Sequence, residues 1–217
     1  AIRNLGTVDE LRVEAAKMVV EEAYVAGNSH IHLPPNFSAF ETVGQAVELA
    51  RQQGLGVLGA SNYYDYTVYG EFGALARQAG IFPLFGMEII CLMPFLRDQK
   101  IKINDPGNPG KFYLCGKGIT EFASLSLKGQ ALLEEIRCND ATRMRGMIDA
   151  VGKYCAERSL ALGLTEDGVI DWVVKRHGCP RETVYLQERH VAQVFQEAIF
   201  SKTTAEERTG KLAHLFG

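Results

Sequence analysis

Two short apolar runs, each preceded by a stretch of helical spacing, constrain the fold more than any other feature of this sequence. The runs are residues 55–60, which contain no polar side chain, and residues 81–90, which contain a single carboxylate, Glu88. Strands without polar alternation are typical of parallel sheets covered on both faces. The stretches 38–54 and 68–79 carry apolar residues three and four apart, as amphipathic helices do. The sequence therefore predicts an α/β fold.

The chain before the first run predicts two helices and a strand between them. The first helix begins near Thr7, has an acidic first turn and ends before Gly27. The second is expected to begin with a capping box formed by Ser38 and Glu41. Between these helices, the segment 28–33 is expected to be a short strand that runs out into a loop at Pro34-Pro35.

The chain after residue 100 predicts a hairpin followed by helices. Segments 101–103 and 111–115 flank a turn-rich stretch at 105–110, which favours two antiparallel strands. Further on, apolar residues at helical spacing predict helices at 125–136, 140–158, 165–176 and 181–200. We therefore expect an α/β domain at residues 1–120 and a helical insertion or appendage at residues 121–217.

Composition excludes several classes of protein. The chain has 217 residues, 47% of them hydrophobic and 23% charged, which is ordinary for a globular protein. A net charge of −3 gives no general attraction to nucleic acid. The five cysteines include no C-x-x-C pair, which favours reduced thiols. Without a signal peptide or an apolar run long enough to span a membrane, we expect a soluble, cytoplasmic protein that does not bind membranes.

His30 and His32 are the first candidate site residues. Side chains two apart on a strand point to the same side, so the two imidazoles are expected to lie together near the strand end. Strand ends are where α/β folds build their sites, and neutral imidazole binds zinc, iron and related ions. The alternative is that both are ordinary loop histidines. Glu88 has similar alternatives: it binds a cation, pairs with an arginine or faces water at a strand tip.

These features resemble the amino-terminal part of the PHP (polymerase and histidinol phosphatase) family. The resemblance rests on His30-x-His32, on a strand that ends in Ala60-Ser61-Asn62, and on the run AGIFPLFGME at residues 79–88. It covers residues 28–90. It implies a (β/α)7 TIM-like barrel, here partial or distorted, that holds a cluster of divalent metals at its strand ends.

Taken residue by residue, the resemblance implies that His30, His32 and Glu88 are metal ligands for Zn, Mn or Fe. The family has Asp-His where this chain has Ser61-Asn62, and an amide oxygen is a weak ligand for a transition metal. The cluster is therefore expected to be incomplete. We expect Ser61, Asn62, Tyr63 and Asp65 to line the same pocket, where Asp65 could replace the missing carboxylate.

The family's later ligands have no counterpart in this sequence. His177 and His190 lie in helical patterns, and His214 lies near the chain end, so all three are expected to be surface or structural histidines. Two explanations remain open. Either the chain stops before the last barrel strands, or part of the metal cluster has been lost.

The functional hypothesis is a metal-dependent hydrolase of the PHP phosphoesterase type with reduced activity, acting on a phosphorylated small molecule or nucleotide. The alternative is a non-catalytic PHP-derived module that binds a phosphorylated ligand or a protein partner. A third hypothesis, contact with nucleic acid through the helical part, is not favoured because acidic residues are interspersed there. Its contacts would be Arg137, Arg143, Arg145, Arg158, Lys175 and Arg176.

Overall fold

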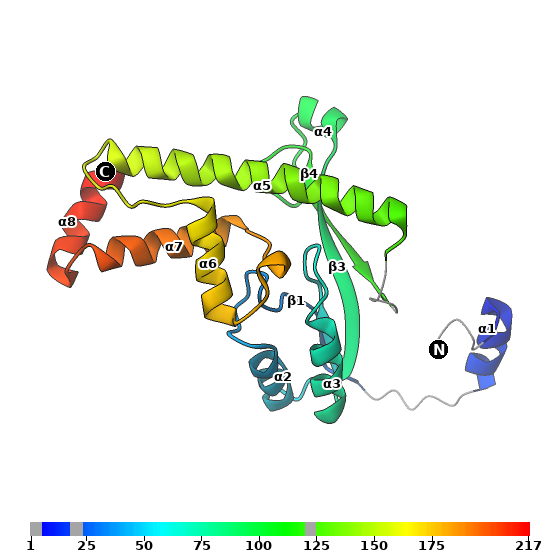
Figure 1. Cartoon of the computed structure of the whole chain (residues 1–217). Helices are drawn as coiled ribbons and strands as arrows, with labels where there is room; N and C mark the ends of the chain where they lie inside the picture. Colours follow the sequence, from blue (N-terminus) through cyan, green and yellow to red (C-terminus); the bar gives the residue numbers. More distant parts are fainter. Residues whose placement is uncertain (1–5, 18–23, 120–124) are drawn as a thin grey trace.

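A four-stranded sheet forms the centre of the molecule (Figure 1). The structure is a computed structural model that describes residues 6–17, 24–119 and 125–217. The strands are β1 (Gly27–Ile31), β2 (Val57–Ala60), β3 (Phe82–Leu92) and β4 (Lys111–Lys117), and they lie in this order across the sheet. The first three are parallel and β4 is antiparallel to β3. The chain is thus a mixed α/β structure, consistent with part of a barrel.

Helices α2 (Val43–Gln52) and α3 (Tyr69–Gln78) connect the parallel strands, as the sequence predicts. They bury their apolar stripes against the sheet, where the core includes Leu33, Leu58 and Phe72. The cap of α2 differs from the prediction. Thr42, not Ser38, caps this helix by accepting a hydrogen bond from the Gln45 N–H group. Ser38 instead donates to the carbonyl of His32 and holds the loop after β1.

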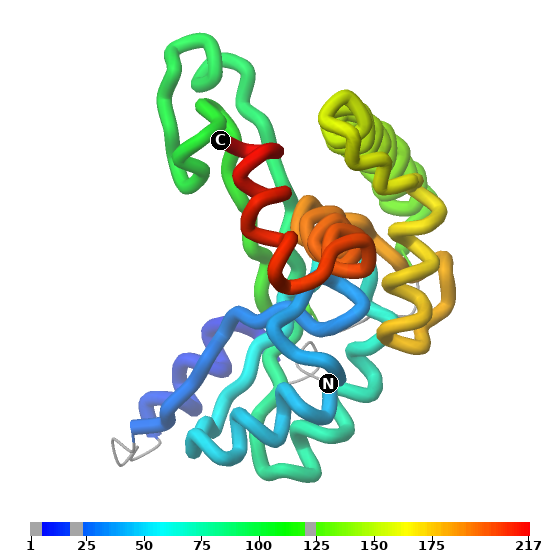
Figure 2. The backbone as a smooth tube through the Cα atoms, turned by 90° about the vertical axis from the view of Figure 1, so that its left-hand side faces the viewer, coloured from blue at the N-terminus to red at the C-terminus, as the bar shows by residue number. Residues whose placement is uncertain are grey.

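The predicted hairpin is wrong in one of its strands. Residues 101–103 are not a strand, and β4 pairs with β3 over seven residues, from Gly86–Lys117 to Leu92–Lys111. The reason is the length of β3, which has 11 residues against four in β2. The edge of β3 opposite β2 offers unpaired backbone groups to a returning strand, and β4 lies at this edge. Figure 2 shows this hairpin, with α4 (Pro94–Asp98) at its tip, projecting from the rest of the chain.

The second half of the chain is helical, as predicted, with different helix boundaries. One continuous helix, α5 (Leu127–Ala156), replaces the two that the sequence predicts on either side of residue 138. Helix α6 (Glu166–His177) begins at the predicted cap, Thr165. Helix α7 (Glu188–Ser201) follows a single 3-10 turn, η2 (Arg181–Thr183). Helix α8 (Ala205–Phe216) was not predicted.

The described part of the first predicted helix is shorter than expected. It is α1 (Val8–Lys17), none of whose residues is buried, and the next six residues of the prediction lie outside the described residues. No helix in the described ranges is both long enough and apolar enough to cross a bilayer.

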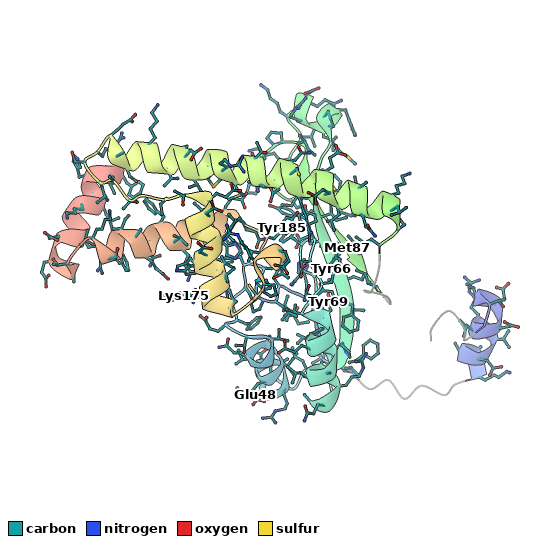
Figure 3. All side chains as sticks on the ribbon, in the orientation of Figure 1. Glu48, Tyr66, Tyr69, Met87, Lys175 and Tyr185 are labelled. Atoms are coloured by element: carbon teal, nitrogen blue, oxygen red, sulfur yellow. The ribbon has the colours of Figure 1, made fainter. Side chains whose placement is uncertain are left out.

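The helical part contacts the sheet part through aromatic residues. Tyr185, which precedes α7, packs with Tyr63 and Tyr64 from the loop after β2, and Ile136 of α5 joins them. Figure 3 shows the labelled Tyr185 in the middle of the molecule, where the helices meet the sheet. A separate core fills the space among α5, α6 and α7 around Met144. The contact cluster brings α7 to the ends of the parallel strands.

Candidate metal centre

His30, His32 and Glu88 lie together at the end of the parallel strands. His30 is in β1, His32 follows it by two residues, and Glu88 lies in β3 beside Tyr63 of the intervening loop. The Nε2 atoms of both histidines lie 3.0 Å from the same oxygen, Oε2 of Glu88. One potential ligand atom from each residue falls within 4.8 Å of the other two. The three side chains therefore form one group of donors that can surround a single ion.

Burial and charge at Glu88 suit a cation. Glu88 is only 5% exposed, whereas the His30 side chain is 38% exposed. Burial raises the pKa of Glu88, but hydrogen bonding from His32 and the charges of both histidines outweigh that effect and hold its pKa below the usual range. A buried carboxylate that stays ionised needs positive partners, which imidazolium groups or a metal ion supply.

Neighbouring side chains orient the two imidazoles. The ring of His32 stacks on Tyr63 with a centroid distance of 5.0 Å and an angle of 7° between the planes. Its Nδ1 atom is buried and has no hydrogen-bond partner within the described part of the chain. Nδ1 of His30 lies 3.7 Å from Sγ of Cys115 on β4. Both imidazoles thus turn Nε2 toward Glu88.

A cavity of about 380 Å³ opens beside the three residues. The α/β part contributes Tyr63, Ile90 and Tyr113 to its lining, and the helical part contributes residues 187–189 at the start of α7. Arg189, which also lies over the ring of Phe37, brings a positive charge to this cavity. Sequence reasoning missed Arg189, since no local pattern shows that residue 189 folds back onto a strand end more than 150 positions earlier.

Among the four residues expected to line the pocket, only Tyr63 borders this cavity. Ser61 is buried and accepts a hydrogen bond from Lys117 of β4. Asp65 accepts hydrogen bonds from both the N–H and the hydroxyl of Thr67, and its carboxylate lies 3.9 Å from Arg137. Its side chain therefore has partners away from the histidines.

Asn62 has a structural role, because its side chain bonds to the backbone of the loop after β1. Its Oδ1 atom accepts a hydrogen bond from the Leu33 N–H group at 2.7 Å, and its Nδ2 group donates to the Leu33 carbonyl at 2.9 Å. Its own N–H group donates to the Tyr69 hydroxyl. These bonds fix the loop after β1 that carries His32, so Asn62 supports the site through the backbone.

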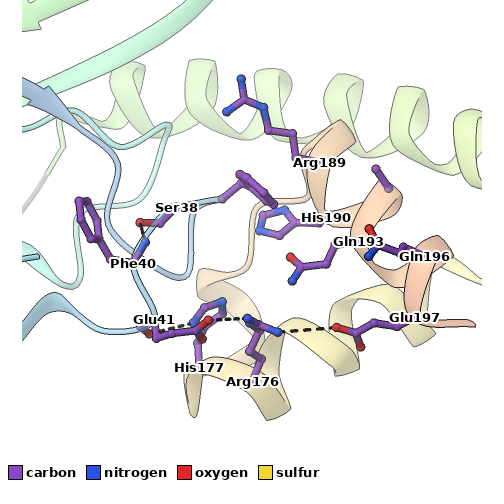
Figure 4. Close-up of a pocket in the computed structure, with 12 residues that line it drawn as sticks. Ser38, Phe40, Glu41, Arg176, His177, Arg189, His190, Gln193, Gln196 and Glu197 are labelled. Carbon is purple, nitrogen blue, oxygen red and sulfur yellow. Dashed lines mark hydrogen bonds and ion pairs between the residues drawn. The ribbon is translucent and has the colours of Figure 1, made fainter. Parts of the chain in front are cut away.

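The remaining histidines lie elsewhere. His177 and His190 line a second cavity of about 520 Å³ between the loop after β1 and helices α6 and α7 (Figure 4). In this cavity, the guanidinium group of Arg176 forms ion pairs with the carboxylates of Glu41, at 2.5 Å, and Glu197, at 3.7 Å. His214 is exposed in α8. All five cysteines are free thiols.

The donor set fits one divalent ion with an open coordination position. Two imidazole nitrogens and one carboxylate are the protein ligands of several catalytic zinc sites, in which water or substrate takes the next position. Manganese and iron accept the same ligands. Neither Ser61 nor Asn62 adds a ligand of comparable strength.

Comparison with known proteins supports the fold. No family model and no curated protein matches this sequence. One similar solved structure is a protein from Bifidobacterium adolescentis, provisionally described as a metal-dependent phosphoesterase, with 15% identity and a TM-score of 0.57 over 87% of this chain and 56% of that one. Another is an amidohydrolase from Chromobacterium violaceum, solved with sulfate and without metal, with 18% identity and a TM-score of 0.52 over 80% of this chain and 50% of that one.

These similarities have a limited scope. The chain spans about half the length of each solved structure that it matches. At such low identity, the shared feature is the fold alone.

Proposed function

We propose that this chain is a PHP-type α/β unit that binds one divalent metal ion through His30, His32 and Glu88 and hydrolyses a phosphoester slowly. The observation that carries the proposal is the convergence of three donor atoms within 4.8 Å at the ends of parallel strands. We further propose that residues 1–120 form the PHP-like domain and that residues 121–217 are an insertion or appendage.

The cavity supports a negatively charged substrate. Arg189 lines it together with Glu188, whose carboxylate is paired with Arg143, and the amino-terminal end of a helix favours anions. Guanidinium and phosphate match each other in charge and geometry. We therefore propose a phosphorylated small molecule or nucleotide as the substrate, oriented by Arg189 so that its phosphorus faces the histidines.

The residues of the chain have separate tasks in this proposal. A divalent ion held by the three ligands would supply a Lewis acid and a water molecule of lowered pKa. Tyr63 stacks on His32 and fixes the direction of its Nε2 atom. Glu88 is buried and charged, and so it would neutralise part of the charge of a bound ion. The slow rate follows because the described residues offer no ligand group for a second ion, which two-metal phosphatases use to stabilise the leaving oxygen.

The basic residues of the helical part give weak support for a nucleic-acid function. Most of the arginines that the sequence offers as nucleic-acid contacts already have partners within the protein. Arg143 pairs with Asp140 and Glu188, and Arg145 pairs with Glu166. Exposed charges that are neutralised within the protein attract phosphate less.

The proposal is tested by metal content and turnover. The chain is equilibrated with Mn²⁺ or Zn²⁺, dialysed, and assayed on an aryl phosphomonoester and an aryl phosphodiester. We expect one ion per chain, and we expect H30A, H32A and E88Q to lose the ion and to lower turnover at least ~100-fold. H214A, which changes an exposed histidine, is the matched control.

Two outcomes separate the hypotheses. Turnover that survives in H30A and H32A would exclude these residues from the active site. One bound ion per chain without turnover on either substrate would favour the alternative, a module that binds a phosphorylated ligand or a protein partner.

The variant R189M distinguishes substrate binding from chemistry, because we expect a higher KM with little change in metal content.

A further inference from the structure

Lys117 lies on the same face of the sheet as the candidate metal centre, two residues further along β4 than the partner of Glu88. In the β3–β4 ladder, Glu88 pairs with Cys115 and Gly86 pairs with Lys117. Side chains two apart on a strand share a face, so Lys117 and Cys115 point to the same side. Ser61 lies level with Gly86 on the other side of β3. This follows because the preceding residues, Ala60 and Phe85, are paired.

Gly86 leaves the space that the Lys117 side chain occupies. A Cβ atom built on Gly86 would lie 3.0 Å from Cδ of Lys117, which is closer than ordinary van der Waals contact. Because Gly86 has no side chain, Lys117 can cross β3 and reach the far strands. Its Nζ atom donates to the carbonyl of Ser29 on β1 at 2.6 Å and to the hydroxyl of Ser61.

The positive charge of Lys117 has no carboxylate partner at contact distance within the described ranges. Both of its acceptors are neutral oxygens. Burial lowers the pKa of Lys117, whereas Cys115 and Glu88 favour its charged form. Lys117 is an exposed residue, and Glu88 of the metal centre is the carboxylate that favours its charged form.

We propose that the Lys117 ammonium takes the place of a second cation beside His30, His32 and Glu88, so that the centre binds one divalent ion and not two. This inference rests on the proposed metal site. A hydroxyl and a carbonyl suit an ammonium, which is a donor with three protons. A second divalent ion would need carboxylates or imidazoles at these positions, and it would be repelled by the fixed charge of Lys117.

The test measures Mn²⁺ stoichiometry in four variants of the full chain. Mn²⁺ is chosen because thiols, such as that of Cys115, bind it weakly. The variants are S61D, K117M, the double variant S61D/K117M, and K111M. Lys111 is the matched control because it lies on the same strand and the same face but has its own carboxylate partner, Asp105, at 3.0 Å.

The expected results follow from charge. Wild type and K111M bind one ion. S61D also binds one, since Lys117 neutralises the introduced carboxylate, whereas S61D/K117M binds two. K117M alone binds one ion at least ~10-fold more tightly than wild type, because a like charge has been removed near the metal.

Three results would overturn the inference: two ions in wild type, two ions in S61D with Lys117 in place, or one ion in a folded S61D/K117M. The last two leave the proposed function standing, whereas two ions in wild type would also contradict the single-ion site of the proposed function. A wild-type chain that binds no ion overturns the proposed function and the inference with it. Circular dichroism establishes folding, and if the double variant does not fold, the Mn²⁺ affinity of K117M decides: no gain over wild type contradicts the role of Lys117.

Discussion

At the scale of single residues, the buried polar side chains differ in the partners they have. Asn62 satisfies both its amide groups on the Leu33 backbone. His190 is 1% exposed, and its Nδ1 atom accepts a hydrogen bond from the Gln187 N–H group at 3.1 Å. This bond requires the proton of the neutral ring to be on Nε2, which has no partner within the described residues. His190 is therefore a neutral part of the core.

The burial of His190 predicts a pH dependence of stability. Burial, together with the charge of His177, lowers its pKa to about 4, against about 6.5 in the unfolded chain. Between these two values the unfolded state binds more protons, so stability is lost as the pH falls from about 6.5 to about 4, by up to roughly 3 kcal/mol.

We expect H190Q to remove most of this dependence, whereas H214Q, at an exposed position, should retain it. The measurement is the urea midpoint at pH 7.0, 5.5 and 4.5. A wild-type midpoint that does not change over this range would show that the proton uptake of His190 is not linked to unfolding.

At the scale of elements, the approach of β1 to β2 depends on a glycine. A Cβ atom built on Gly59 would lie 2.3 Å from the carbonyl oxygen of Ser29, and a backbone atom cannot move aside as a flexible side chain can. The close approach of the two strands lets His30 of β1 reach Glu88 of β3. Gly146 in α5 is different, because its added Cβ would meet no atom within 4 Å.

This contrast predicts opposite effects for two substitutions of the same type. We expect G59A to destabilise the chain by at least about 2 kcal/mol, because β1 must move away. It should also weaken Mn²⁺ binding, since His30 moves with the strand. We expect G146A to stabilise by about 0.5–1 kcal/mol, because alanine favours a helix interior over glycine. Denaturant unfolding and metal titration check both, and a G59A variant of wild-type stability would contradict this strand packing.

At the scale of the whole molecule, the helical part completes the site. Phe37, in the loop after β1, donates its N–H group to the side chain of Gln187, and Arg137 of α5 donates to the carbonyl of Tyr64. Tyr185 packs on Tyr64 with a centroid distance of 4.9 Å. These contacts hold the start of α7 over the strand ends, which is how Arg189 reaches the cavity.

The contact predicts how the two parts depend on each other. We expect Y185A to destabilise the chain by about 3 kcal/mol through the cavity that it creates and to reduce substrate affinity, because α7 loses its support. The Tyr185 hydroxyl has no hydrogen-bond partner among the described residues, so Y185F should have nearly wild-type stability. Thermal unfolding and KM check this, and equal stability of Y185A and Y185F would mean that the ring does not join the parts.

The sequence by itself determined the local elements and the three candidate ligands. Apolar runs and helical spacing depend on nearby residues, and they predicted β2, β3, α2, α3 and the helical second half. The pair His30 and His32 could be placed on one side because side-chain direction alternates along a strand. A buried carboxylate such as Glu88 stands out because its charge is costly without a partner.

Only the tertiary structure decided which distant residues share the site. It showed that β4 pairs with β3, that Lys117 reaches Ser61, and that α7 brings Arg189 to the cavity. It also showed that Asn62 faces the Leu33 backbone and Asp65 has partners of its own. The physical reason is that local propensity is set by neighbours in the chain, whereas these positions depend on packing between segments that are far apart in sequence.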